Sequence, residues 1–83
     1  MRSRKPSPKP IEPIYVQFGE AVREARINKC MSQQEVADRV GLIRTSVVNI
    51  EAGRQRVLLN DVLKFAKALR VSPRFFVNRL NLY

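Results

Sequence analysis

From Ile14 onward, apolar residues recur at three- and four-residue spacing, the period of an amphipathic α-helix that buries one face. Five such stretches follow one another, separated by short turns. None of them alternates apolar and polar residues as a half-buried strand does. The pattern therefore predicts an all-α fold, a compact five-helix bundle over residues 14–83.

Local signals place the ends of the first two helices. The first is expected to end near residues 28–30, and its apolar face comprises Phe18, Ala21, Val22 and Ala25. The second begins after Ser32, because Glu35 three residues later completes a capping box, in which each side chain bonds the other's free backbone N–H. Gly41 is expected to end this helix in the left-handed conformation. Its apolar face comprises Val36, Ala37 and Val40.

The other three helices carry similar signals. The third covers residues 44–52, with Val47 and Ile50 facing inward and Gly53 closing it. Asn60 is the expected cap of the fourth helix, and Ser72 is that of the fifth, where Pro73 suits the first helical position. The residues expected to be buried from the fourth helix are Val62, Leu63, Ala66 and Leu69.

The first thirteen residues differ in composition from the rest. Residues 1–13 hold four of the five prolines, with Glu12 as the only acid. Their cations are Arg2, Arg4, Lys5 and Lys9. Because alternating proline denies this stretch regular hydrogen bonding, we expect a flexible, extended basic arm. Such an arm either lies along DNA or only keeps the protein soluble, and the sequence leaves both readings open.

Charge indicates the class of partner. Sixteen Lys and Arg against seven Asp and Glu give +9 in 83 residues, which is typical of proteins that bind nucleic acid. The chain has no His and a single Cys, Cys30, so it lacks the commonest general base, a zinc site and an internal disulfide. Apolar runs of at most three residues exclude a membrane span. We expect a cytoplasmic binding protein that is not an enzyme and has no metal or cofactor.

The stretch from Ser32 to Arg54 contains two short predicted helices with only residues 41–43 between them. So short a turn forces the second helix to cross the first steeply, as in a helix-turn-helix unit. If Val47 and Ile50 face the first helix of the unit, the opposite side of residues 44–52 is free for the major groove. The candidate base-contacting residues on that side are Arg44, Thr45, Val48 and Asn49.

This stretch resembles the phage-repressor family of helix-turn-helix regulators, of the Cro/cI or XRE type. The resemblance is carried by Ser32-Gln33, Glu35, Ala37, Gly41-Leu42, Ile50-Glu51 and Gly53-Arg54, and extends over about residues 18–76. It implies a lambda-repressor-like domain and a dimeric, sequence-specific binder of double-stranded DNA that regulates transcription. A repressor is the first expectation, and an activator stays open. One position departs from the family pattern, because Ile43 stands where a Ser or Thr usually caps the recognition helix.

The resemblance also implies further roles. Contacts with DNA phosphates are expected from Gln33, Ser46, Arg54, Arg56 and Asn60. Arg26 and Glu51 match a partly buried ion pair that joins the recognition helix to the first helix, and we expect this pair to be structural. For the dimer interface the carboxy-terminal segment is the expected surface, with Phe76, Val77 and Leu80 as the candidates and Phe75 in the core.

Two alternatives remain open at this point. The same domain serves as the DNA-binding antitoxin of a toxin–antitoxin pair, whose defining partner is a second protein. A basic protein that binds RNA or anionic lipid through charge alone would also account for +9, although it would not account for the ordered motif.

Overall fold

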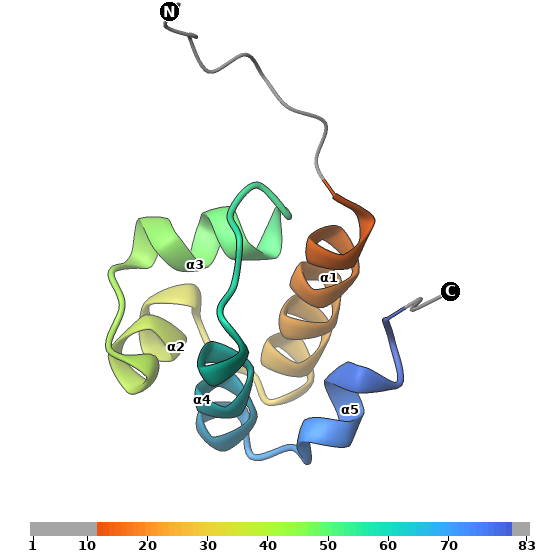
Figure 1. Ribbon diagram of the computed structural model, residues 1–83. Coiled ribbons are helices and arrows are strands. Elements are labelled where there is room, and N and C mark those ends of the chain that lie inside the picture. Colours follow the sequence, from red (N-terminus) through yellow and green to blue (C-terminus); the bar gives the residue numbers. More distant parts are fainter. Residues whose placement is uncertain (1–11, 81–83) are drawn as a thin grey trace, which may run out of the picture.

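Five α-helices follow one another along residues 12–80, the part of the chain that the computed structural model describes (Figure 1). They are α1 (Pro13–Asn28), α2 (Gln33–Val40), α3 (Arg44–Glu51), α4 (Leu59–Leu69) and α5 (Pro73–Val77). No strand occurs among these residues, so the prediction of an all-α fold is confirmed. The four arm cations, at positions 2, 4, 5 and 9, lie outside the described residues.

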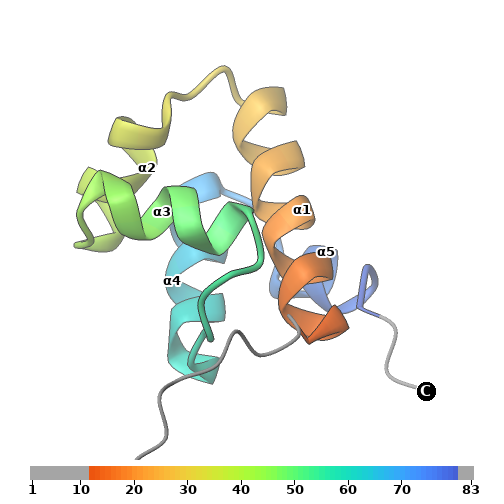
Figure 2. The ribbon, with the colours of Figure 1, turned by 90° about the horizontal axis from the view of Figure 1, so that it is seen from above.

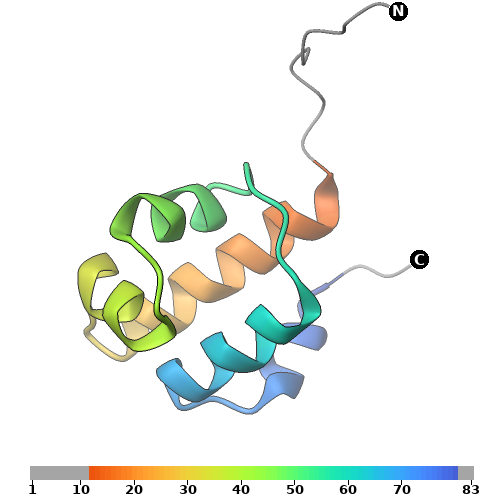
Figure 3. The ribbon, with the colours of Figure 1, turned by 60° about the vertical axis from the view of Figure 1, so that its left-hand side comes forward.

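Helix α1 crosses the molecule between two helix pairs. One pair is α2 and α3, and the other is α4 and α5 (Figure 3). Contacts of α1 with α3, α4 and α5, and of α2 with both α3 and α4, close the bundle. Helix α3 therefore lies on the outside of the bundle with only one side packed.

The helix ends follow the local signals in most places. Ser32 Oγ accepts the Glu35 N–H at 3.0 Å, and the Glu35 carboxylate accepts the Ser32 N–H at 2.7 Å, so the capping box is confirmed. Gly41 is left-handed with φ of 77°. Ser72 Oγ accepts the Arg74 N–H at 3.2 Å, and Pro73 is the first residue of α5. These ends are decided by side chains within four residues of each other.

Two predictions near helix starts need correction. Helix α1 begins at Pro13, so Glu12 and Pro13 are its cap and first residue and not part of the arm. Asn60 is not the cap of α4, because the helix already begins at Leu59 and the Leu58 N–H bonds the Asp61 carboxylate at 3.1 Å. A proline at the first helical position and an acid in the first turn both favour these earlier starts.

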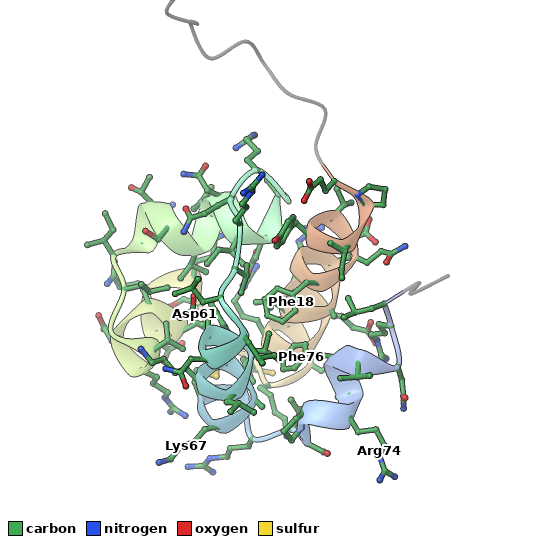
Figure 4. All side chains as sticks on the ribbon, in the orientation of Figure 1. Phe18, Asp61, Lys67, Arg74 and Phe76 are labelled. Atoms are coloured by element: carbon green, nitrogen blue, oxygen red, sulfur yellow. The ribbon has the colours of Figure 1, made fainter. Side chains whose placement is uncertain are left out.

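The core is built around aromatic rings from α1, α4 and α5. The Phe18 ring packs edge-on against Phe65 at a centroid distance of 5.9 Å and tilted against Phe76 at 5.1 Å. Figure 4 shows Phe18 and Phe76 together between the three helices. Phe65 takes the buried side of α4, and Leu63, predicted to be buried, is instead 53% exposed on the other side.

Phe76 is fully buried, so its prediction as a dimer-interface residue is wrong. The physical reason is the aromatic contact with Phe18, which a second protomer cannot share. Its neighbour Phe75 is only half-buried, because the Arg79 guanidinium covers its ring at 3.7 Å from the centroid. Phe75 thus packs at the edge of the core, against the Phe76 ring, while Phe76 lies inside it.

Candidate nucleic-acid interface

The turn between α2 and α3 sets the position of α3. It consists of residues 41–43, and the Leu42 N–H closes it by bonding the Ala37 carbonyl at 2.9 Å. With so short a connection, α3 leaves α2 at once and packs against both α2 and α1. The view in Figure 2 looks onto α3, with α4 behind it and α5 behind α1.

Helix α3 has one buried side and one open side. Val47 and Ile50 point inward and are almost completely buried. Arg44 and Thr45 are exposed, and Val48 and Asn49 are half-buried on the opposite side. The structure therefore brings the four candidate base-contacting residues together on the solvent side of one helix.

The first turn of α3 has no side-chain cap. Ile43 occupies the cap position, offers no oxygen and is 69% exposed. The free N–H groups at the start of α3, with the positive end of the helix dipole, face outward beside Arg44 and Thr45. This end of α3 can accept an anion.

The chain turns sharply after α3, and the loop that follows the turn carries two exposed arginines. The Gly53 N–H bonds the Ile50 carbonyl at 3.0 Å and the Arg54 N–H bonds the Asn49 carbonyl at 2.9 Å, which is a Schellman motif with Gly53 left-handed at φ of 76°. A Cβ on Gly53 would also lie 2.8 Å from the Val16 Cα. Glycine at this position therefore allows Arg54 and Arg56 to follow α3 as exposed loop residues.

A side-chain hydrogen bond links two of the candidate DNA-contacting residues. The Arg54 guanidinium donates to the Asn49 amide oxygen at 3.2 Å. The bond is exposed, so water competes with it, and Asn49 can exchange it for a base edge. Ser46 is half-buried on the same helix, and Asn60 is exposed in the first turn of α4.

Beneath this surface, Glu51 joins three helices. Arg26 of α1 donates to the Glu51 carboxylate from Nε at 2.6 Å and from Nη2 at 3.2 Å, so the expected ion pair is present. The side chain of Arg26 is 14% exposed and that of Glu51 is 5% exposed. Arg26 also donates to the Met31 carbonyl at 3.0 Å and so holds the loop before α2.

The second partner of Glu51 is Gln33, the first residue of α2. The Gln33 amide nitrogen donates to the Glu51 carboxylate at 3.1 Å. Because an ionised carboxylate only accepts, this bond fixes which end of the Gln33 amide faces inward. The same nitrogen carries a second N–H group. No sequence signal pointed to this bond, because residues 33 and 51 belong to different helices.

Comparisons with known proteins give the family. The helix-turn-helix family HTH_3 matches residues 22–76. Control protein C.BamHI of Bacillus amyloliquefaciens is 40% identical over 62 residues, which cover 74% of this chain and 76% of that protein. The restriction-modification controller protein C.AhdI from Aeromonas hydrophila is also 40% identical, with a TM-score of 0.71 over 75% of this chain and 94% of that one.

A further solved structure shares the fold at lower identity. It is the controller protein C.Esp1396I, a tetramer in complex with its natural 35 base-pair operator, with 22% identity and a TM-score of 0.74 over 81% of this chain and 88% of that one. The matched family region includes all of α2, α3 and α4, and thus the whole candidate interface. The chain belongs to the helix-turn-helix family HTH_3, as its resemblance to phage-repressor-type regulators indicated.

Proposed function

We propose that this protein is a sequence-specific regulator of transcription that binds double-stranded DNA as a homodimer and reads the major groove with α3. The observation that carries the proposal is the open side of α3, where Arg44, Thr45, Val48 and Asn49 lie opposite the buried Val47 and Ile50. The 40% identical relatives are a control protein and a restriction-modification controller, which supports a regulator over an enzyme.

The residue types on α3 suit the edges of base pairs. Arg44 can donate two bonds to guanine O6 and N7, and Asn49 can bond adenine N6 and N7. The methyl groups of Thr45 and Val48 can contact the thymine methyl group. Together these side chains distinguish base pairs, which backbone contacts alone do not.

Residues around α3 suit the phosphates. Arg54 and Arg56 supply charge in the loop after α3, and Ser46 and Asn60 supply neutral donors nearby. Gln33 adds its second N–H at the start of α2, where the helix dipole is positive. These five residues would set the position of α3 in the groove and add affinity that is independent of sequence.

The second copy fits a different surface from the predicted one. Three leucines at the start of α4 are more than half exposed, Leu58 at 71%, Leu59 at 82% and Leu63 at 53%, and we call them the leucine surface. Leu59 also lines an apolar hollow together with Leu80. Large exposed apolar side chains mark interaction sites, and a self-complementary pair of these surfaces gives a twofold dimer. Of the predicted interface residues, this proposal keeps Leu80.

The antitoxin alternative is not favoured, because the 40% identical relatives are a control protein and a restriction-modification controller protein. Among the described residues, no helix is long and apolar enough to cross a membrane. With chromosomal or plasmid DNA as the partner, we place the protein in the cytoplasm. We assign it the role of a repressor that acts by occupying its operator.

Selection of bound sequences from random duplex DNA tests the proposal. We expect one preferred duplex, bound at two half-sites about one helical turn apart, roughly 34 Å. Arg44→Ala and Asn49→Ala should each lower affinity for it by about 1–3 kcal/mol and relax the choice at one base position. Arg56→Ala is the matched control and should weaken preferred and random duplexes equally. Equal weakening by all three variants would contradict base reading by α3.

A further inference from the structure

A second basic surface lies between α2 and α4. Five of the twelve lysines and arginines within residues 12–80 gather here, against three, Arg44, Arg54 and Arg56, on α3 and the loop after it. We name it the α2–α4 basic surface, and its members are Lys29, Arg39, Lys64, Lys67 and Arg70, all exposed. Most of the positive charge gathered on the folded part is thus not on the reading helix.

These five cations surround two adjoining hollows. Arg39 and Ala68 line both of them, with Lys29 and Arg70 beside one and Lys64 and Lys67 beside the other. The Arg39 guanidinium donates to the Ala68 carbonyl at 3.4 Å, which holds it at the centre. The cations therefore face one continuous concave strip.

Little negative charge offsets this strip. Among residues 12–80, Asp38 is the only acid that lines either hollow, and its carboxylate accepts a bond from the Gln34 amide at 2.9 Å. Repulsion among five cations destabilises the free protein slightly, and an anionic partner would relieve it.

The strip lies away from the DNA-reading side. Figure 4 places Lys67 at the foot of the molecule, whereas α3 runs along the top. A duplex that receives α3 in its major groove is therefore on the opposite side from Lys67. At 0.1 M salt, interactions between exposed charges are screened beyond about 10 Å. The charge of Lys67 therefore contributes little to the binding of that duplex.

The chemistry of the strip favours a phosphate backbone over a protein. Protein interfaces are built around large apolar or aromatic anchors and are poor in lysine. None of the large exposed apolar residues lines the two hollows, and three of the five cations are lysines. Lys64 and Lys67, one helical turn apart, form a row of cations of the kind that neutralises successive phosphates.

We propose that the α2–α4 basic surface binds the sugar–phosphate backbone of a second nucleic-acid duplex while α3 occupies the preferred duplex. One protein assembly would then hold two duplex segments together. The inference rests on the proposed function only for the assignment of α3 to the first duplex.

The test uses full-length protein saturated with its preferred duplex, to which a labelled 20 base-pair duplex of random sequence is added at several salt concentrations. We expect a ternary complex. The double variant K29Q/K67Q, which removes one cation from each hollow, should weaken the second binding by about tenfold or more and lower its log–log salt slope by up to about 1.8. Affinity for the preferred duplex should stay within about twofold, since the lost charges are screened from it.

The matched control is R23Q/R74Q, which removes the same charge from exposed positions that line neither hollow. Equal effects of the two double variants would overturn the proposal, because net charge alone would then explain the binding. Absence of a ternary complex would also overturn it. Binding of polyglutamate without binding of a duplex would overturn it as well, because this result is expected of a site for an acidic protein.

Failure of this inference can be told from failure of the proposed function. If selection yields no preferred duplex, the proposed function fails. The R44A/N49A variant has an impaired α3 surface. Its affinity for a random duplex still includes the contribution of the α2–α4 basic surface. A further drop of that residual affinity in the added K29Q/K67Q background supports the second site, and an unchanged residual affinity contradicts it.

Discussion

At the scale of single residues, the two ion pairs of the described chain illustrate how burial decides the effect of a charge. The Arg26–Glu51 pair is almost enclosed, and each partner has additional hydrogen bonds, to Met31 and to Gln33. The Glu24–Arg79 pair joins α1 to the end of α5 in solvent, with side chains 47% and 37% exposed. Similar geometry therefore implies different consequences on mutation.

Glu51→Ala should lower the free energy of unfolding by about 3–5 kcal/mol, because it leaves the Arg26 charge nearly buried without its partner. Thermal and urea denaturation measure this loss. The control is Glu24→Ala at the exposed pair, where the loss should be far smaller. A Glu51→Ala variant with wild-type stability and no DNA binding would show that Glu51 acts at the DNA instead.

The Glu24–Arg79 pair predicts a small pH dependence of stability. The hydrogen bond and charge of Arg79 lower the pKa of Glu24 below its ordinary value of 4.5, against a weaker opposing effect of desolvation. A carboxyl whose pKa is lower in the folded state stabilises the fold above pH 4.5, and this contribution is lost as the pH falls through the lowered pKa.

The difference in melting temperature between wild type and Glu24→Gln should therefore be largest at neutral pH and vanish in acid. Thermal melts from pH 7 to pH 3 test this. Arg79→Gln should show the same pH-dependent part together with a loss that does not depend on pH, because Arg79 also covers the Phe75 ring and donates to the Phe75 carbonyl. A difference that persists unchanged to pH 3 would rule out Glu24 ionisation as its cause.

At the scale of helices, backbone contacts explain two features that side-chain patterns do not reveal. Cys30 after α1 and Arg70 after α4 are left-handed, with φ of 58° and 57°, although neither is a glycine. Their N–H groups and those of the following residues close the same kind of turn as at Gly53. The loops that begin at these residues need this sharp reversal, and the fold tolerates the strain.

Gly19, in the middle of α1, marks the closest approach of α1 to α3. A Cβ there would lie 2.2 Å from the Ile50 carbonyl oxygen and 2.7 Å from that of Glu51. Both are backbone atoms, so the end of α3 would have to move. Gly19 thereby sets the depth at which α3 packs on α1.

Gly19→Ala should destabilise the protein by about 1–3 kcal/mol, since overpacking against backbone outweighs the gain of roughly 1 kcal/mol that alanine brings to a helix interior. Chemical denaturation measures the change. Glu20→Ala, at the exposed neighbouring position, is the control and should change stability by less than about 0.5 kcal/mol. A more stable Gly19→Ala variant would mean that the two helices are not in close contact.

At the scale of the whole molecule, the surface has three distinct regions. The open side of α3 carries the candidate base readers, the leucine surface lies at the start of α4, and the α2–α4 basic surface lies beyond it. The three regions have no residue in common, so each can be altered by mutation without removing a residue of another.

The leucine surface predicts how the dimer is disrupted. L59E/L63E should raise the dimer dissociation constant by about tenfold or more, because charges would be buried against a second copy, while the exposed positions leave the monomer folded. Sedimentation measures the dimer, and circular dichroism measures the fold. The control is Val77→Glu, on α5 and 48% exposed, where no change is expected. Loss of the dimer in Val77→Glu but not in L59E/L63E would contradict this proposal and would place the interface on the predicted carboxy-terminal segment.

Much of this protein could be predicted from neighbouring residues alone. The five helices, the Ser32–Glu35 capping box and the left-handed Gly41 each depend on atoms within one or two turns of chain, so spacing and residue type suffice to predict them. The inward Val47 and Ile50 leave Arg44 and Asn49 on the open side of α3, and helical periodicity already implies this.

Tertiary structure decided the features that join distant segments. Periodicity identified both Phe75 and Phe76 as apolar, but only the ring of Phe18 on α1 determines that Phe76 is the buried one. Periodicity also predicted that Leu63 is buried, but Phe65 occupies the buried side of α4 because it contacts Phe18. The bond from Gln33 to Glu51 and the gathering of cations between α2 and α4 likewise arise only when separate helices meet. A sequence records which residues can be buried or charged, whereas packing decides which of them meet, because each helix can rotate until its largest side chains fill the common core.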